Sequence, residues 1–271
     1  MKSKTAHNQP SPILAYLAEL AGTAWMMFNG LTWISLNFSP KSLIVEWIPN
    51  STLRLCLTGI CFAGGATAVV YSPLGKLSGG HLNPSVTFGF WLMQKISTRD
   101  ALAYIGMQIV GAFVGTALVV LVWSDFARSI NLGATLLGTG VTPAQGFGIE
   151  VGITFMLMLT ILAVVNSTRT RWTGIVSGVL VALLVSTESP LTGTSLNPAR
   201  SFAPAALGSL WQHQWIYWIA PPLGAALATL LYQQGLIGTG KSYCSKLFHI
   251  TSIPCHHPRC GYCNPAEIDH F

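Results

Sequence analysis

Two asparagine–proline pairs recur in this sequence in similar surroundings, and the second Asn follows the first by 114 residues. The matching stretches are Gly79-Gly80-His81-Leu82-Asn83-Pro84-Ser85 and Gly193-Thr194-Ser195-Leu196-Asn197-Pro198-Ala199. Asn is a good helix N-cap and Pro is favoured in the first helical turn, so each pair predicts the start of a helix. The Asn amides also carry N–H donors for the oxygen of a small neutral molecule. Helix capping alone would not explain why the motif occurs twice.

Three charged residues lie within apolar segments, where a charge needs a partner or a polar cavity. Arg200 follows the second Asn-Pro pair, and a cation at membrane depth is typical of a permeation pathway; the alternative is a structural ion pair. Glu19 and Glu150 are the carboxylates that we expect deep inside these segments. No nucleophile or metal cluster accompanies them there, so the pattern does not predict an enzyme.

The composition places these residues in a membrane. Only 8% of the 271 residues are charged and 51% are apolar, whereas a typical soluble domain has about 25% charged residues. These values exclude an ordinary soluble enzyme, a disordered regulator and a secreted disulfide scaffold. The net charge of +6 comes without a basic run interleaved with aromatics, so no nucleic-acid partner is predicted. The expected partner is the lipid bilayer.

Six apolar segments are long enough to cross a membrane, which takes about 20 residues. They cover residues 13–36, 51–72, 101–123, 145–166, 172–187 and 214–236. Two shorter apolar stretches, 82–92 and 196–207, follow the Asn-Pro pairs. Their length suits re-entrant half-helices, which enter and leave the membrane from the same side.

The distribution of Lys and Arg predicts the orientation. With both termini in the cytoplasm, three basic residues face the opposite side: Lys41, Arg54 and Arg128. Ten face the cytoplasm: Lys2, Lys4, Lys76, Lys95, Arg99, Arg169, Arg171, Lys241, Lys246 and Arg259. The polar segment 1–12 lacks the layout of a signal peptide. We therefore expect a multi-pass protein of a bacterial inner membrane or a plasma membrane.

The chain contains an internal repeat, with halves at about 13–123 and 145–236. Glu150 follows Glu19 by 131 residues, and Gly224 follows Gly111 by 113 residues. Each half has three spans, an odd number, so the second half must lie inverted in the membrane. Inverted repeats with broken helices place a permeation site near the midplane. The predicted fold class is therefore an all-α membrane protein with six transmembrane helices and two half-helices.

The doubled motif, the paired Glu residues and Asn-Pro-Ala-Arg resemble the aquaporin (major intrinsic protein) family over roughly residues 13–236, and a microbial member is expected. The first motif departs from the family pattern, with Ser85 where Ala is usual. The resemblance implies a passive water channel that excludes protons and ions, needs no cofactor and forms a homotetramer. The alternatives are a channel for small neutral solutes, an ion- or proton-coupled transporter, and a purely structural or adhesive protein.

The resemblance also assigns roles to residues. Glu19, Glu150 and His81 would support the pore loops, and Ala63, Val185, Thr194 and Arg200 would form the outer constriction. Small side chains at the first two constriction positions favour glycerol, urea or metalloid acids. Other positions favour water, namely Ser201, Ala205 and the pair Tyr217-Trp218. If Phe62 rather than Ala63 faced the pore, the constriction would be narrower, because a one-residue shift rotates a helix by about 100°.

The last segment, residues 237–271, is a Cys- and His-rich tail that we expect in the cytoplasm. It contains Cys244 and His249, and its candidate zinc ligands are Cys255, Cys260, Cys263, His256 and His257. Thiolate and imidazole are the ligands that zinc prefers. Disulfides are rare in the cytoplasm, so the open alternatives are a metal site and a tail with free thiols.

Overall fold

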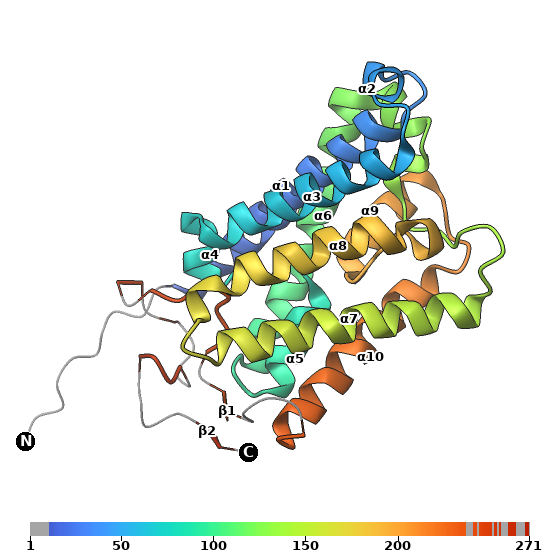
Figure 1. Ribbon diagram of the computed structural model, residues 1–271. Coiled ribbons are helices and arrows are strands. Elements are labelled where there is room, and N and C mark those ends of the chain that lie inside the picture. The colour runs from blue at the N-terminus through green and yellow to red at the C-terminus, as the bar shows by residue number, and fades with distance from the viewer. Residues whose placement is uncertain are drawn as a thin grey trace, which may run out of the picture.

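The computed structural model describes residues 11–236, 241–242, 244–250, 252–253, 255, 260–263 and 269–270. Six long helices run side by side (Figure 1): α1 (Pro12–Phe38), α3 (Ser51–Tyr71), α6 (Thr98–Arg128), α7 (Pro143–Val165), α8 (Thr173–Thr192) and α10 (Gln214–Gln233). Two half-helices, α5 (Pro84–Leu92) and α9 (Pro198–Gly208), begin at the Asn-Pro pairs. The predicted all-helical membrane fold is confirmed. Residues 1–10, most of the predicted N-terminal segment, lie outside the described residues.

Short elements join the long helices and mark the two ends of the bundle (Figure 1). At one end lie α2 (Leu43–Trp47) and the 3-10 helix η1 (Asn131–Gly133); this is the α2 end. At the other lie α4 (Pro73–Ser78), the 3-10 helix η2 (Thr170–Trp172) and the tail; this is the tail end. In the tail, β1 (Lys241–Ser242) pairs antiparallel with β2 (Asp269–His270).

Five stretches are long and apolar enough to cross a membrane: Ser51–Tyr71, Thr98–Arg128, Pro143–Val165, Thr170–Thr192 and Gln214–Gln233. The 27-residue helix α1 is not among them, although it was predicted as a span. Polar side chains on its buried face, such as Glu19, Thr23 and Asn37, explain its lower hydropathy. It packs along α6, as α7 packs along α10.

Two helices are longer than the sequence predicts. The span expected to end at residue 187 continues to Thr192, because Pro190 is accommodated inside α8 and Gly193, at φ 81°, ends the helix. The span expected to end at residue 123 has non-helical dihedrals at Trp123 and continues to Arg128. Both extensions lie at the α2 end, where they bring loops toward the pore.

Glycines related by the repeat make two close helix crossings. A Cβ on Gly111 would lie 2.3 Å from the carbonyl oxygen of Leu20, and one on Gly224 would lie 2.3 Å from that of Val151. Val151 follows Leu20 by 131 residues, the same offset as between the two predicted Glu residues. The two halves of the repeat therefore pack in the same way.

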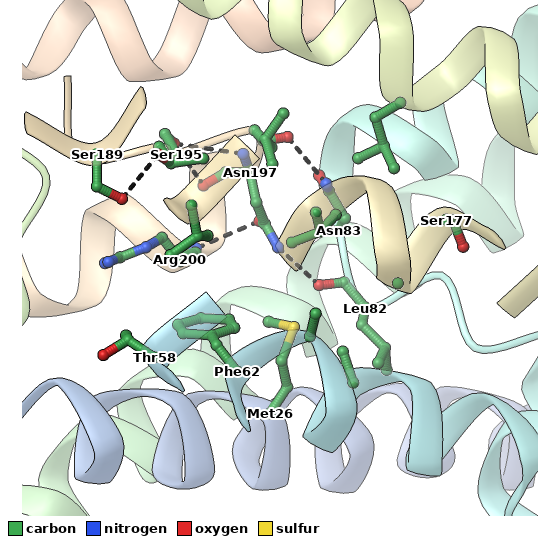
Figure 2. Close-up of a pocket in the computed structure, with 18 of the residues that line it drawn as sticks. Met26, Thr58, Phe62, Leu82, Asn83, Ser177, Ser189, Ser195, Asn197 and Arg200 are labelled. Carbon is green, nitrogen blue, oxygen red and sulfur yellow. Dashed lines mark hydrogen bonds between the residues drawn. The ribbon is translucent and has the colours of Figure 1, made fainter. Parts of the chain in front are cut away.

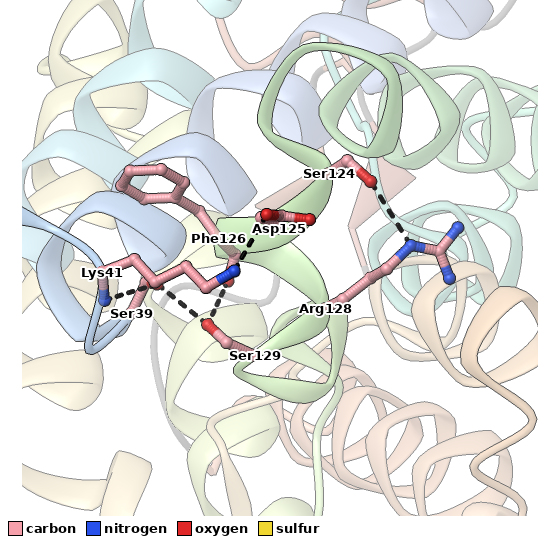
Figure 3. A network of polar contacts seen from close by, with 7 residues as sticks. All are labelled: Ser39, Lys41, Ser124, Asp125, Phe126, Arg128 and Ser129. Atoms are coloured by element: carbon pink, nitrogen blue, oxygen red, sulfur yellow. Dashed lines mark hydrogen bonds and ion pairs between the residues drawn. The ribbon is translucent and has the colours of Figure 1, made fainter.

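The loop after α1 is tied to the end of α6 at the α2 end (Figure 3). Lys41 Nζ lies 2.9 Å from Asp125 Oδ2, and the hydroxyls of Ser39 and Ser129 are 2.9 Å apart. The side chains of Lys41 and Asp125 are 55% and 73% exposed, so this ion pair contributes little to stability. The ion pair holds the loop after α1 beside η1.

The crossings predict the stability of glycine variants. Gly111→Ala and Gly224→Ala should each cost about 1–3 kcal/mol, since the new methyl would overlap a backbone carbonyl and force the helices apart. Gly106→Ala and Gly152→Ala are matched controls, because nothing lies within 4 Å of their added Cβ. Thermal unfolding of the purified variants in detergent tests this, and equal midpoints for the two pairs would contradict it.

Candidate functional pore

A cavity of about 560 Å³ runs through the bundle between the two half-helices. Its lining extends from Phe38 at the α2 end, past Asn83 and Asn197, to His81 and Leu247 at the tail end. The cavity therefore reaches from one end of the bundle toward the other. The two Asn-Pro motifs lie at its middle (Figure 2).

The two Asn side chains are bonded across the repeat (Figure 2). Asn83 Nδ2 donates to the carbonyl of Leu196, and Asn197 Nδ2 donates to that of Leu82, each at 2.9 Å. Their Oδ1 atoms accept from the first turns of α5 and α9, as the predicted N-caps require. An amide NH₂ has two donors, so the second donor of each Asn remains for a molecule in the cavity.

The loop before α5 is held by Glu19. Its carboxylate accepts from the hydroxyl of Ser78 at 2.6 Å and from the backbone N–H groups of His81 and Leu82 at 3.0 and 2.8 Å. Gln108 of α6 adds a fourth donor at 2.8 Å. These bonds satisfy a non-helical backbone that has no access to water in a membrane.

Glu150 does the same for the loop before α9. It accepts from Thr192 Oγ1 at 2.6 Å and from the N–H groups of Ser195 and Leu196 at 2.8 and 3.0 Å. Leu82 and Leu196 both have positive φ, 54° and 56°, which is uncommon for a branched residue and costs about 1–3 kcal/mol. The carboxylates offset that cost and leave the Leu carbonyls facing the two Asn amides.

His81 and Ser195 are equivalent positions of the repeat, and each side chain contacts a hydroxyl of the half-helix that follows it. His81 Nδ1 lies 3.0 Å from Thr87 Oγ1 of α5, and Ser195 Oγ lies 2.5 Å from Ser201 Oγ of α9. The other ring nitrogen of His81, Nε2, donates to the carbonyl of Ser245 in the tail at 2.8 Å. The predicted support role of His81 thus extends to a contact that the sequence did not suggest.

The predicted constriction residues all line the cavity. They are Ala63, Val185, Thr194 and Arg200. The guanidinium of Arg200 donates to the carbonyl of Gly133 at 2.9 Å and lies 5.7 Å from the centre of the Phe62 ring. Arg has five N–H donors, so others are left for a molecule in the cavity. The hydroxyl of Thr194 is 2.9 Å from that of Ser189.

Phe62 also lines the cavity, next to the predicted Ala63. Six cavity-lining positions of α3 recur every three or four residues and share one face, namely Ser51, Leu55, Thr58, Phe62, Ala66 and Val70, and Ala63 and Thr67 at its edge line the cavity as well. Ala63 lies beside this face. Phe62 packs closely against Gly30 of α1, where a Cβ would come within 2.3 Å of the ring, so the ring is fixed at the level of Arg200 (Figure 2).

A third carboxylate, Glu188, lies deep in the bundle, so the expectation that only Glu19 and Glu150 do so is wrong. Glu188 is buried, and its Oε1 lies 2.5 Å from the hydroxyl of Thr192. The same hydroxyl bonds Glu150 at 2.6 Å. One hydroxyl has one proton to donate, so a second proton on one of the carboxyls is needed to bond both. Glu188 lies one residue beyond the predicted end of this span at residue 187, whereas α8 continues to Thr192.

The tail brings four ligand-type side chains together. The ligand atoms of Cys244, His249, Cys255 and Cys260 all lie within 4.8 Å of one another. Of the predicted ligands, Cys255 and Cys260 belong to this cluster, and the Cys263 sulfur lies 3.5 Å from His249 Nε2. His256 and His257 lie outside the described residues. Cys244 and His249 were identified in the sequence as tail residues, but only the fold brings them next to Cys255 and Cys260.

The tail thiols differ in acidity. Contacts with the thiols of Cys244 and Cys255 lower the pKa of Cys260 below its usual range, and a contact with His249 adds to this. Burial raises the pKa of Cys244. Thiolates are the form in which Cys binds metals.

Comparison with known sequences agrees with this geometry. The profile of the family described as "Major intrinsic protein" matches residues 6–232. Human Aquaporin-4 is 38% identical over 182 residues, which are 66% of this chain and 56% of that protein. The chain thus spans little more than half the length of human Aquaporin-4. Glycerol uptake facilitator protein-like 6 of Lactiplantibacillus plantarum is 36% identical over 221 residues, 79% of this chain and 94% of that protein.

A solved structure has the same fold. The X-ray structure of the aquaglyceroporin from Plasmodium falciparum aligns with a TM-score of 0.69, covering 83% of this chain and 97% of that one. The sequence identity of this pair is 24%, so the likeness supports the fold alone. The bacterial relative fits the expected microbial membership.

The carboxylate supports predict the effect of removing one acceptor. Glu19→Gln and Glu150→Gln would turn a donor toward backbone N–H groups, and each should cost about 1–3 kcal/mol for the unsatisfied groups. Glu46→Gln on the exposed surface of α2 is the control. Thermal unfolding in detergent measures the change; if all three variants unfolded with wild-type midpoints, the support role would be wrong.

Proposed function

Because the chain belongs to the major intrinsic protein family, whose members are passive channels and not enzymes, we propose that it conducts water across a membrane. The observation that carries this proposal is the crossed pair of Asn side chains. Each spends one N–H donor on a carbonyl of the other half of the repeat and keeps the second for the cavity. Two donors at one level hold a passing water by its oxygen, with both of its hydrogens turned away.

The same arrangement supports exclusion of ions and protons. The N-termini of α5 and α9 meet at the two Asn residues, and each helix contributes about half a positive charge there. A water held by its oxygen is a poor link in a proton chain. Arg200 adds a full positive charge on the cavity wall, which opposes cations a second time.

The constriction bears on the choice between water and larger solutes. Phe62 beside Arg200 narrows the cavity and favours water. The small side chains of Ala63 and Val185 favour small neutral solutes such as glycerol or urea, and one relative carries the name glycerol uptake facilitator protein-like. We therefore propose water as the main permeant and small neutral solutes as the alternative.

We further propose a cytoplasmic tail end and a homotetrameric assembly. Lys76, Arg171 and Lys246 gather at the tail end, whereas Lys41, Arg54 and Arg128 belong to the α2 end. The positive-inside rule then favours both termini in the cytoplasm of a bacterial inner membrane or a plasma membrane. The tetramer is an inference from family membership.

The permeation proposal predicts the behaviour of two aromatic variants in proteoliposomes. In the presence of a zinc chelator, wild-type vesicles should shrink faster than empty vesicles in a sucrose gradient. Phe62→Ala should raise glycerol flux by about tenfold or more while water flux persists, since the ring and Arg200 bound the opening. Phe88→Ala is the control, because Phe88 stacks on Trp91 and does not line the cavity.

Two results would contradict this assignment. Shrinkage of wild-type vesicles no faster than that of empty ones, in the absence and presence of a zinc chelator, would reject water permeation. Equal glycerol flux in wild type, Phe62→Ala and Phe88→Ala would reject the role of Phe62. The pair Ala63→Phe with Val185→His should then suppress solute flux if those two positions form the constriction instead.

We propose that water conduction needs no cofactor and that the tail holds a structural zinc ion. Tetrahedral zinc with Zn–S bonds of about 2.3 Å places its ligand atoms roughly 3.8 Å apart. The sulfur atom of Cys244 lies 3.3 Å from that of Cys255 and 3.5 Å from that of Cys260. The Cys260 sulfur lies 3.6 Å from His249 Nε2. Three thiols and one imidazole at this spacing fit a closed Cys₃His site.

Metal analysis tests the zinc proposal. Purified wild-type protein should contain about one zinc per chain, and Cys244→Ser with Cys260→Ser should reduce it to near zero, because a Cys₃His site loses two of four ligands. Cys56→Ser with Cys61→Ser, both in α3 and away from the tail, is the matched control. Equal zinc in all three proteins would reject the site.

A further inference from the structure

We propose that the zinc-held tail closes the channel at the tail end, with Leu247 as the plug and zinc release as the opening step. The closing segment is Ser245–Phe248, which we term the finger. This inference rests on the proposed pore and zinc site and assigns them a joint regulation. It concerns a part of the chain that water conduction itself does not use.

The finger contacts the mouth of the pore at every position. The carbonyl of Ser245 accepts from His81 Nε2 at 2.8 Å, and the backbone N–H of Leu247 donates to the carbonyl of Gly79 at 3.0 Å. Both partners belong to the loop that leads to Asn83. The finger is therefore bonded to the same non-helical backbone that Glu19 holds in place.

Side chains of the finger reinforce this seat. Lys246 is 2% exposed and donates to the carbonyl of Lys76 on α4 at 2.8 Å. The ring of Phe248 lies 4.8 Å from that of Tyr71 at the end of α3. The buried Lys246 and the contact between the two aromatic rings fix the finger against α3 and α4.

Leu247 occupies the position that matters for permeation. Its side chain is 5% exposed, lines the cavity and belongs to the buried apolar cluster that includes Val70, Val86 and Leu196. It thus places an apolar group at the tail-end mouth, below the polar Asn pair. A hydrophobic constriction blocks a narrow pore by excluding water.

The proposed zinc ligands bracket the finger in sequence. Cys244 precedes Ser245 and His249 follows Phe248, so a metal bound to both closes the finger into a short loop. Cys255 and Cys260 complete the cluster from the rest of the tail, which is itself anchored by the bond from Tyr262 to the carbonyl of Val165 at 3.0 Å. Loss of the metal removes the tie at both ends of the finger and lowers the cost of lifting Leu247 from the mouth.

Water flux in proteoliposomes tests the closure. Vesicles with zinc on both sides should have low osmotic water permeability, and EDTA on both sides should raise it at least about fivefold by releasing the hydrophobic block. In zinc, vesicles with Leu247→Ala should be as permeable to water as wild-type vesicles in EDTA. This variant should keep its zinc content. Ile250→Ala is the matched control, one residue beyond His249 and absent from the cavity lining, and it should behave as wild type.

A second readout does not depend on conduction. Ser177 lines the cavity on α8, and Ser177→Cys can be labelled by a membrane-impermeant thiol reagent and quantified by peptide mass spectrometry. Labelling should be slow in zinc and faster in EDTA, and fast in both when combined with Leu247→Ala. If labelling rises in EDTA but no protein conducts water, the plug stands and the proposed permeation fails.

Two results would overturn the plug. One is equal labelling of Ser177→Cys in zinc and in EDTA from protein that contains one zinc per chain. The other is equal water permeability of wild type and Leu247→Ala in zinc. Either result would leave the pore and the zinc site in place but would show that the tail does not close the channel.

Discussion

The centre of a bilayer offers no water to backbone N–H and C=O groups, and the architecture of this channel depends on how two broken helices meet that constraint. Glu19 and Glu150 take up the N–H groups of the loops before the half-helices. The carbonyls of Leu82 and Leu196 then bond the Asn amides of the opposite repeat. The consequence is a cavity through the bundle with the two Asn side chains in its lining, because the irregular backbone is tolerated only where protein or a cavity satisfies it.

The internal repeat made many of these contacts predictable from the sequence. Asn83 and Asn197, Glu19 and Glu150, and Gly111 and Gly224 are spaced so that equivalent residues meet equivalent partners. Local chemistry agrees with the tertiary contacts at these positions, since Asn83 and Asn197 both cap the half-helices and line the cavity. The sequence predicted which residues lie near the constriction, but not how the helix that carries Phe62 and Ala63 is rotated about its axis. Phe62 and Ala63 are neighbours on one helix, and only the packing of Phe62 on Gly30 determines which side chain lies at the level of Arg200.

The remaining features depend on contacts between distant parts of the chain. Glu188 was missed because Pro190 indicates a turn by local rules, whereas α8 continues through it to Thr192. In the tail, the spacing of Cys255 and Cys260 suggested a metal site, but the convergence of Cys244 and His249 on it follows from docking of the tail beside Gly79. Such docking has no periodic signature. It brings the Cys and His cluster of the tail to the mouth of the cavity, two features that lie apart in the sequence.

The proposed function requires that the crossed Asn pair passes water and stops protons. The direct measurement is simultaneous recording of osmotic shrinkage and proton leak, with an internal pH dye, in zinc-chelated proteoliposomes subjected to a sucrose step and a pH gradient. We expect fast water flux with a proton leak equal to that of empty vesicles. A proton leak that rises in proportion to the water permeability would contradict the account, because it would mean that the water file stays connected past Asn83 and Asn197.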